Sequence, residues 1–298
     1  NFVMSTGTVT LPTGTATIAG SCDNASGTFA HNNSVVVFNG SGTRSVRQSG
    51  SDFTNAFYDV VFAGSGTYTF LDTRATTTNN FSITSGSVTL PSTLLTIGGS
   101  FLNTAGTFSS NSGTVKVSGS GLHSIDTNAS FYNLLFDGTG TTTFVDTSVT
   151  ASEDVTILGG VVTFPSNTFT IGGSIVNQAT VLHASGTVLM NSSDTGETVS
   201  LGSSPLAHLV FNSGTGGWTI TESATTTGST TLTSVGQFTV NPGVALAVGG
   251  VFTNTAVGAS TTWTGSILAL ISGTSYSINT KTNTPEIYST LLVGQNTD

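Results

Sequence analysis

Short apolar words separated by small polar residues run along the whole chain. The words are about four to six residues long, rich in Val, Leu, Ile, Phe and Thr, and they come about every 8 to 12 residues, with Gly, Asn or Ser-Gly between them. Val and Thr favour strands, whereas Gly and Asn favour turns. No window of a dozen residues has the apolar stripe of an amphipathic helix. The pattern predicts an all-β chain.

The region from residue 87 to residue 157 shows these words most clearly. Strands are predicted near Ser87–Leu90, Leu94–Ile97, Thr107–Phe108, Thr114–Val117, Leu134–Phe136, Thr142–Phe144 and Val155–Ile157.

One of the words recurs at a long interval. Val9-Thr10-Leu11-Pro12 returns as Val88-Thr89-Leu90-Pro91, as Val162-Thr163-Phe164-Pro165 and, more loosely, as Phe238-Thr239-Val240-Asn241-Pro242. A long and nearly constant interval between the prolines is typical of a solenoid or of a string of small domains. The chain therefore reads as about four repeats of ~75 residues, approximately 1–79, 80–153, 154–230 and 231–298.

An aromatic word follows each proline and supports the same period. It reads Phe57-Tyr58-Asp59-Val60-Val61-Phe62 in the first repeat and Phe131-Tyr132-Asn133-Leu134-Leu135-Phe136 in the second. The first repeat carries extra residues near Arg47 to Phe53, where a surface loop would absorb an insertion. The phenylalanines of these words are expected in the core, because the words are among the most apolar of the chain. An exposed stripe that stacks on sugars is the alternative.

Two all-β architectures fit the repeats. One is a parallel β-solenoid of coils of roughly 20 residues that stack on one another. The runner-up is a row of small β-sandwiches. The solenoid is favoured because no proline-rich or charged linker separates the repeats and because tight glycine corners suit a coiling chain. Stacked coils would also place Thr on Thr, Asn on Asn and Val on Val, and such ladders tolerate hydroxyl and amide groups better than like charges. One continuous solenoid over residues 1–298 is expected.

Composition narrows the range of partners. Charged residues make up 6% of the chain, against about 25% in ordinary soluble domains, while Ser and Thr make up about a third by count. The net charge is −9 and only five residues are Lys or Arg, so a basic surface for nucleic acid is not expected. No run of 18 apolar residues is present to span a membrane as a helix.

At this point the sequence resembles the repeat regions of large bacterial cell-surface proteins that form parallel β-helices. The resemblance covers nearly the whole chain and is carried by Leu95-Thr96-Ile97-Gly98-Gly99-Ser100-Phe101-Leu102-Asn103, by the segment Gly113 to Gly121, and by Phe131 to Phe136. It implies export and display at the cell surface as adhesin, stalk, sheath or surface-layer material. The fourth repeat departs most from the pattern and carries Trp263. Terminal repeats of solenoids are usually atypical.

Candidate chemistry is sparse. Glycoside cleavage usually needs two carboxylates at a defined separation, and the adjacent acids Glu153 and Asp154 would point to opposite faces of a strand. Asp72 and Asp146 occupy equivalent repeat positions, which favours a shared turn-capping role over calcium binding. The remaining candidates for a site, which are not at metal-ligand or crosslinking spacing, are His31, His123, His183, His208, Lys116 and Lys281.

Two kinds of modifiable residue remain. Cys22 is the only cysteine, so no disulfide forms within the chain, and a small buried apolar side chain is the favoured interpretation. Glycosylation is a further hypothesis, because Asn-x-Ser/Thr sequences occur at Asn24, Asn32, Asn39, Asn80, Asn128 and Asn191. Unmodified turn or ladder residues are the alternative for these positions.

We expect a non-catalytic, extracellular structural protein without metal or cofactor. It would be a subunit of a cell-surface filament, sheath or surface layer that assembles head to tail with copies of itself through its solenoid ends. The alternative is an adhesin or fibre module that binds a surface glycan or a host receptor on its lateral face. A polysaccharide-degrading β-helix enzyme is the third possibility, and the sequence offers no acidic cluster for it.

Overall fold

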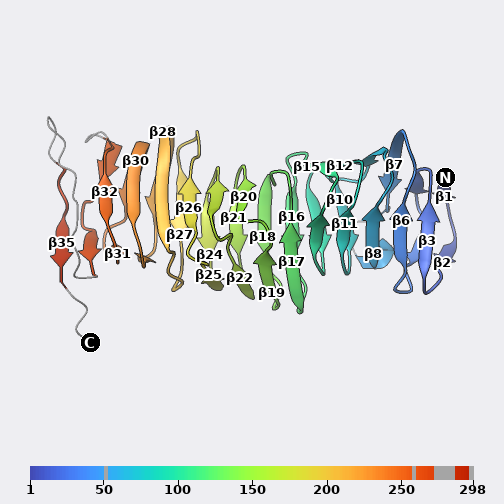
Figure 1. Cartoon of the computed structure of the whole chain (residues 1–298), viewed down its shortest axis with the longest axis horizontal. Helices are drawn as coiled ribbons and strands as arrows, with labels where there is room; N and C mark the ends of the chain where they lie inside the picture. Colours follow the sequence, from blue (N-terminus) through green and yellow to red (C-terminus); the bar gives the residue numbers. More distant parts are fainter. Residues whose placement is uncertain (50–52, 257–259, 272–285, 295–298) are drawn as a thin grey trace. The chain divides into compact units, whose positions relative to one another are not determined.

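The computed structural model describes residues 1–49, 53–256, 260–271 and 286–294. Contacts divide the chain into two compact units, Asn1–Asp146 and Thr147–Asp298. Parallel strands stack coil upon coil in each unit, so the predicted all-β solenoid is confirmed (Figure 1). The described residues make about 14 turns in all. The boundary between the units falls inside a sequence repeat, and a single continuous solenoid stays a prediction.

The described part of unit 1 consists of short strands and a short turn of 3-10 helix. The elements are β1 (Phe2–Met4), β2 (Thr8–Thr10), β3 (Thr15–Ile18), β4 (Cys22–Asn24), β5 (Thr28–Ala30), β6 (Val35–Phe38), β7 (Thr43–Arg47), η1 (Phe53–Asn55), β8 (Asp59–Phe62), β9 (Thr67–Phe70), β10 (Arg74–Thr77), β11 (Phe81–Ile83), β12 (Ser87–Thr89), β13 (Leu94–Ile97), β14 (Phe101–Asn103), β15 (Thr107–Ser109), β16 (Thr114–Val117), β17 (Leu122–Asp126), β18 (Asn133–Phe136) and β19 (Thr141–Phe144).

Unit 2 is built in the same way over its described residues. Its strands are β20 (Ser148–Ala151), β21 (Val155–Ile157), β22 (Val161–Thr163), β23 (Thr168–Ile171), β24 (Ile175–Asn177), β25 (Thr180–Leu182), β26 (Thr187–Met190), β27 (Glu197–Ser200), β28 (His208–Ile220), β29 (Ala224–Thr226), β30 (Thr230–Val240), β31 (Ala245–Val248), β32 (Phe252–Asn254), β33 (Thr261–Thr262), β34 (Ile267–Leu270) and β35 (Thr290–Val293).

The strand registers give the length of a coil. Thr114 pairs with Asn133 of the next coil, and Val35 pairs with Asp59. The predicted coil of roughly 20 residues is therefore confirmed. Parallel strands normally need long crossovers. Here the chain between two paired strands is the rest of one coil, and it contains the strands that belong to the other faces of the solenoid.

The core consists of columns of identical or similar apolar side chains. The rings of Phe38 and Phe62 stack with centroids 5.0 Å apart, and those of Phe81 and Phe101 lie 5.5 Å apart. All four side chains are fully buried, and each such burial contributes about 1.5–3 kcal/mol. The other phenylalanines expected in the core, Phe57, Phe131 and Phe136, are buried as well. The apolar words are thus the inward faces of the coils.

The sequence repeat is not a whole number of coils. In unit 1, β1, β4, β7 and β9 pair in one sheet, while their equivalents one repeat later, β11, β14, β17 and β19, pair in another. Likewise β3, β6 and β8 share a sheet, while β13, β16 and β18 lie in a third. Equivalent strands of successive repeats therefore occupy successive faces of the solenoid.

This rotation corrects one expectation. Threonines and valines do stack in register, as at Thr8 on Thr28 and Val36 on Val60. Asn24, however, pairs with Met4 of the preceding coil, so the prediction of Asn on Asn is wrong there. Residues stack on the next coil, and not on their equivalents in the next repeat.

The strands predicted over residues 87–157 are all present, with ends shifted by at most one position. The prediction misses β14, β17 and β20 in that stretch. These strands are short or have polar or small inward positions, such as Asn103 in β14 and His123 in β17. The apolar pattern alone does not separate them from turns.

Candidate functional site

A buried asparagine ends one strand in each sequence repeat. Asn24, Asn103, Asn177 and Asn254 close β4, β14, β24 and β32, and each is at most 2% exposed. Their intervals along the chain equal those between the four repeat prolines. The sequence therefore carries a signal for these positions that the strand prediction does not use.

Two of these amides hold turns in unit 2. The Asn177 Nδ2 donates to the Leu201 carbonyl of the next coil at 2.9 Å, and its Oδ1 accepts from the Ala179 N–H at 3.0 Å. At Asn254 the Oδ1 accepts from the Ala256 N–H at 3.1 Å, while the buried Nδ2 has no hydrogen-bond partner among the described residues. A buried amide whose groups are satisfied stabilises a turn, whereas an unpaired one is costly.

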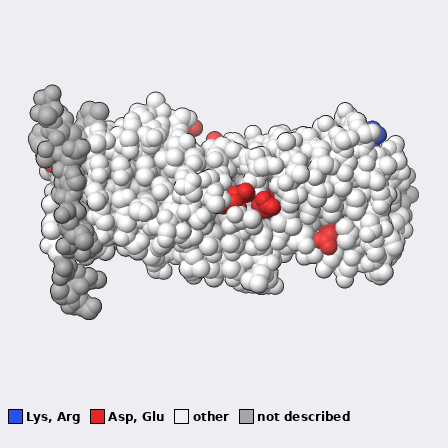
Figure 2. Space-filling view, viewed as in Figure 1, with Lys and Arg blue, Asp and Glu red and all other residues white. Residues whose placement is uncertain are grey.

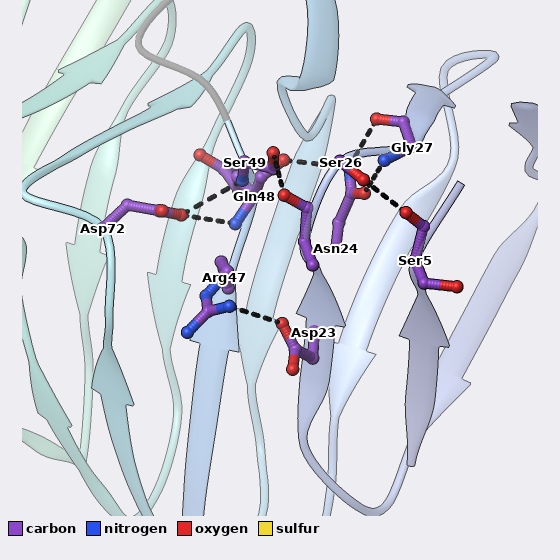
Figure 3. Close-up of polar contacts among 10 residues, drawn as sticks. Ser5, Asp23, Asn24, Ser26, Gly27, Arg47, Gln48, Ser49 and Asp72 are labelled. Atoms are coloured by element: carbon purple, nitrogen blue, oxygen red, sulfur yellow. Dashed lines mark hydrogen bonds and ion pairs between the residues drawn. The ribbon is translucent and has the colours of Figure 1, made fainter. Parts of the chain in front are cut away.

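In unit 1 the equivalent asparagine, Asn24, belongs to a polar network between coils (Figure 3). Asn24 Nδ2 donates to the carbonyls of Gly27 at 3.1 Å and Gln48 at 2.9 Å, and Oδ1 accepts from the Gly27 N–H at 2.8 Å. The Ser26 hydroxyl donates to the Ser5 carbonyl, and the Ser49 hydroxyl donates to the Ala25 carbonyl at 2.8 Å. The bonds between coils run along the stacking direction and tie consecutive coils together.

Asn103 differs from the other three asparagines. Its Nδ2 donates to the side-chain Oδ1 of Asn128, which lies on the next coil. Its own Oδ1 is buried and has no hydrogen-bond partner among the described residues. This amide therefore links two coils without closing a turn of its own.

The equivalent acids Asp72 and Asp146 cap turns of the preceding coil, as predicted. Asp72 Oδ2 accepts from the Gln48 N–H at 2.6 Å and the Ser49 N–H at 3.2 Å (Figure 3). Asp146 Oδ2 accepts from the Thr127 N–H at 2.5 Å. Burial, followed by the negative charge of Asp146, raises the pKa of Asp126. Because Asp146 is engaged as a cap, this carboxylate pair has a structural explanation.

Several other charged or histidine side chains are also held by structural contacts. Lys116 Nζ forms an ion pair with Asp137 at 2.6 Å, and Asp154 accepts from the Ser174 N–H at 2.8 Å. His31 and His183 accept the N–H of the second residue after them, at 3.0 and 3.1 Å. Among the described residues, no group of three or more His, Cys, Asp or Glu could hold a metal ion. Lys281 lies outside those residues.

The remaining two histidines face different surroundings. His208 Nδ1 lies 2.9 Å from the Ser229 hydroxyl and accepts the Ser229 N–H at 3.1 Å. His123 is 7% exposed, and neither of its ring nitrogens has a hydrogen-bond partner in the described structure. The ring lies beside the turn glycines Gly119 and Gly140, whose lack of a Cβ leaves room for it. The His123 imidazole is therefore a buried ladder side chain.

A cavity of about 420 Å³ in unit 2 is lined by residues 261–264 and by Glu286, Ile287 and Ser289. Its carboxylate, Glu286, accepts hydrogen bonds from Trp263 Nε1 at 2.7 Å and from the Thr261 hydroxyl. Glu286 is the only acid among these lining residues. They therefore do not assemble a general acid and base pair of the glycosidase type.

Cys22 is buried at the start of β4, as expected for a small apolar side chain. Burial, followed by the charge of Asp23, raises the pKa of its thiol to about 12. The thiol is therefore neutral, and thiolate chemistry needs the charged form.

The asparagines of the six glycosylation sequences differ in accessibility. Asn24 is buried, so its amide is out of reach in the folded chain. Asn80 is half-buried, and its Oδ1 accepts from the Ser100 N–H at 2.9 Å. The exposed members are Asn32, Asn39, Asn128 and Asn191. Glycosylation of these residues stays a prediction.

The first coil of unit 1 presents an open β edge. Among the described strands, β1, β2 and β3 each pair with one partner only, namely β4, β5 and β6. Gly14 and Ile18 direct their carbonyls to the next coil, where they accept the N–H groups of Val35 in β6 at 3.0 Å and of Asn39, just after β6, at 3.3 Å. Because backbone groups alternate along a strand, the N–H and C=O groups of Thr17 point to the opposite side.

The inward column at this edge is only partly covered. Ile18 is half-buried, while Phe38 and Phe62, the next members of its column, are fully buried. Ile18 thus offers part of its side chain to a further coil.

The last described strand is similar in this respect. In unit 2, Leu291 and Val293 of β35 continue the inward column of Leu268 and Leu270 and are 42% and 63% exposed. A further coil stacked on β35 would cover these two side chains.

Comparisons with family models, with curated proteins and with solved structures found no match for this chain. Among the described residues, no helix is long and apolar enough to cross a membrane.

Proposed function

We propose that this protein is a non-catalytic structural component of the cell exterior, built to be extended coil upon coil. The observation that carries the proposal is the open edge of the first coil, where β1, β2 and β3 have one partner strand each among the described strands. Such an edge is a template for further strands. For the 298-residue chain, the proposed partner is the last coil of another copy, in a head-to-tail contact that does not close.

Two further observations support this function. The aromatic side chains whose exposure is described are all buried or half-buried, so a lateral stripe for sugar stacking has no support among them. Most of the acids described above form ion pairs or accept hydrogen bonds from backbone or side-chain groups, and three of the described histidines accept backbone N–H groups while His123 is buried. In a structural protein these residues serve through their contacts within the protein, whereas a lectin or hydrolase needs groups that are free to contact a ligand.

A single proline tests the contact without disturbing the solenoid itself. Thr17→Pro removes an N–H group that points away from β6, so it leaves the pairing of β3 with β6 in place while blocking a strand on the free side. We expect the variant to keep the β-sheet circular dichroism of the parent and to sediment as monomer at concentrations where the parent forms polymers.

The matched control places the same change on an outward position of an inner strand. Ser82 lies in the middle of β11, which pairs with β8 on one side and β14 on the other. Ser82→Pro therefore removes a ladder bond and should lower stability instead of changing assembly alone. A parent chain that stays monomeric at high concentration, or a Thr17→Pro variant that polymerises like the parent, would contradict the proposal.

A further inference from the structure

One face of unit 1 carries a regular array of hydroxyl groups. The strands β7, β9, β12 and β15 lie side by side in one sheet, and each presents two outward Ser or Thr residues, two positions apart. Their registers align these residues in two columns across four coils. The members of this hydroxyl array are Thr43, Ser45, Thr67, Thr69, Ser87, Thr89, Thr107 and Ser109.

The backbone under the array is firmly anchored. The residues between the two columns, on the opposite face of the sheet, include Tyr68, Val88 and Phe108, which are 0%, 0% and 7% exposed. The Tyr68 hydroxyl also donates to the Gly40 carbonyl at 2.9 Å. The spacing of the array is therefore fixed by core packing and strand pairing, and a ligand that binds it meets a preformed surface.

The hydroxyls of the array have no partner within the described part of the chain. Elsewhere hydroxyls bond back to the protein, as Thr84 does to the Phe62 carbonyl at 3.2 Å and Ser85 to the Gly64 carbonyl at 3.0 Å. None of the eight array side chains makes such a bond to a described residue. Their donors and acceptors are thus directed to whatever lies against this face.

Charge and aromatic groups are missing from the array itself. The nearest ion pair, Arg47 with Asp23 at 3.4 Å, lies beside it on β7 and β4 and neutralises itself (Figure 3). Arg44 turns back to the carbonyls of Ala19 and Thr43. An ionic lattice or polyanion would need charge, and stacked sugar rings would need aromatic faces. The kind of ligand that still fits the array is an uncharged lattice held together by hydrogen bonds.

The spacing of the array matches such a lattice. Neighbouring strands lie about 4.7–4.9 Å apart, and outward residues two positions apart lie about 6.6 Å apart. In a tetrahedral network of O–H···O bonds of about 2.75 Å, second neighbours lie about 4.5 Å apart and the axial repeat of the hexagonal form is about 7.3 Å. Across four coils the mismatch along the stack adds up to about 1 Å, and between the two columns of each strand it is about 0.7 Å, so both stay well below the length of one O–H···O bond.

We propose that the hydroxyl array is a binding site for ice, in which its hydroxyls take the places of water oxygens at a crystal surface. The strands one repeat after β7 and β9 supply an internal contrast. There Leu122 replaces Thr43, and its side chain is 88% exposed, so the equivalent strands β17 and β19 lack a complete array.

The test measures incorporation of the purified chain into slowly growing ice, together with inhibition of ice recrystallisation. Thr69→Lys places a long charged side chain at an inner position of the array, and we expect both activities to fall about tenfold or more, equivalent to about 1.4 kcal/mol. Thr143→Lys makes the same change at the equivalent position on β19 and should leave both activities at the parent level. Circular dichroism and thermal unfolding establish that both variants are folded.

Three results would overturn the inference. They are a parent chain that is excluded from ice like an ordinary protein, a Thr69→Lys variant as active as the parent, and equal losses in Thr69→Lys and Thr143→Lys. The parent could instead be excluded from ice but retained on microcrystalline cellulose or chitin. If Thr69→Lys loses that retention, the array is reassigned as a binding site for a polysaccharide surface. Enrichment in ice that depends on Thr69 and not on Thr143 supports the site.

Discussion

At the scale of single residues, buried polar groups decide how well a coil is held. Asn177 illustrates this, since it is 1% exposed and its amide joins a turn to the next coil. A buried N–H or C=O that loses its partner costs about 1–3 kcal/mol. Asn177 is therefore a structural side chain. Changing it leaves the Ala179 N–H without its partner and takes one of two donors from the Leu201 carbonyl, which also accepts from the Ser204 N–H at 3.3 Å.

We predict that Asn177→Leu lowers the free energy of unfolding by about 1–3 kcal/mol, because the Ala179 N–H loses its partner and the Leu201 carbonyl loses one of its two donors. Asn191 is exposed in the same unit, and Asn191→Leu should change stability by less than about 0.5 kcal/mol. Urea denaturation of both variants measures the difference. Equal effects of the two substitutions would show that the buried amide does not hold the turn.

Cys22 gives a prediction on pH. Its folded-state pKa of about 12 lies above the ordinary value of 9.0. The stability linked to this group is therefore fully present below pH 9 and is lost as pH rises from 9 towards 12, by about 1.4 kcal/mol per pH unit. The wild-type chain should lose stability in that window faster than Cys22→Ala, as measured by denaturation at stepped pH. Parallel curves for the two proteins would contradict the assigned burial.

At the scale of the element, the corners between strands limit how closely coils can stack. A Cβ built on Gly64 would lie 2.2 Å from the Gly40 carbonyl oxygen of the preceding coil, closer than side-chain carbons approach backbone atoms. At this position glycine suits the coiling chain, as expected, because any larger side chain would collide with the backbone of the preceding coil. Gly14, by contrast, has nothing within 4 Å of its would-be Cβ.

Replacing each of these two glycines by alanine should separate the effect of steric clearance between coils from the effect of flexibility in the unfolded chain. Gly64→Ala is expected to destabilise the protein by about 1–3 kcal/mol through overpacking. Gly14→Ala should be neutral or slightly stabilising, because it only reduces the freedom of the unfolded chain. Thermal unfolding measures both, and a neutral Gly64→Ala would mean that the coils can move apart at no cost.

Much of the element scale can be predicted from the sequence, because inward apolar residues and glycine punctuation are local signals. Strands Leu94–Ile97 and Thr114–Val117 are predicted to the residue. The capping role of Asp72 and Asp146 follows from their repeat positions. The hydroxyl array cannot be predicted in this way, because its columns depend on coil lengths that vary from coil to coil and differ from the period of the repeat.

At the scale of the whole molecule, the rotation of the repeat around the solenoid matters most. Since equivalent strands of successive repeats fall on different faces in unit 1, a surface feature of one repeat is not multiplied along a single face. Extension by further coils is different, because it needs only an open edge and a matching inward column. The edge of β1 to β3 provides both.

The low charge of the chain is consistent with extension by stacked coils. Charged residues are 6% of the sequence, and most of the surface seen in Figure 2 carries neither acid nor base. Stacked coils place like residues close together, where like charges would repel. We expect polymer formation to change little with ionic strength, since backbone bonds and apolar columns are screened far less than exposed charges. Light scattering from low to high salt measures this, and assembly abolished by salt would point to a charged interface instead.

The central claim, that the chain is a structural solenoid extended through its open coils, is tested most directly by electron microscopy of the purified chain at several concentrations. The account predicts unbranched filaments whose number grows with concentration and whose subunits join first coil to last coil. Particles that stay single at every concentration would contradict it.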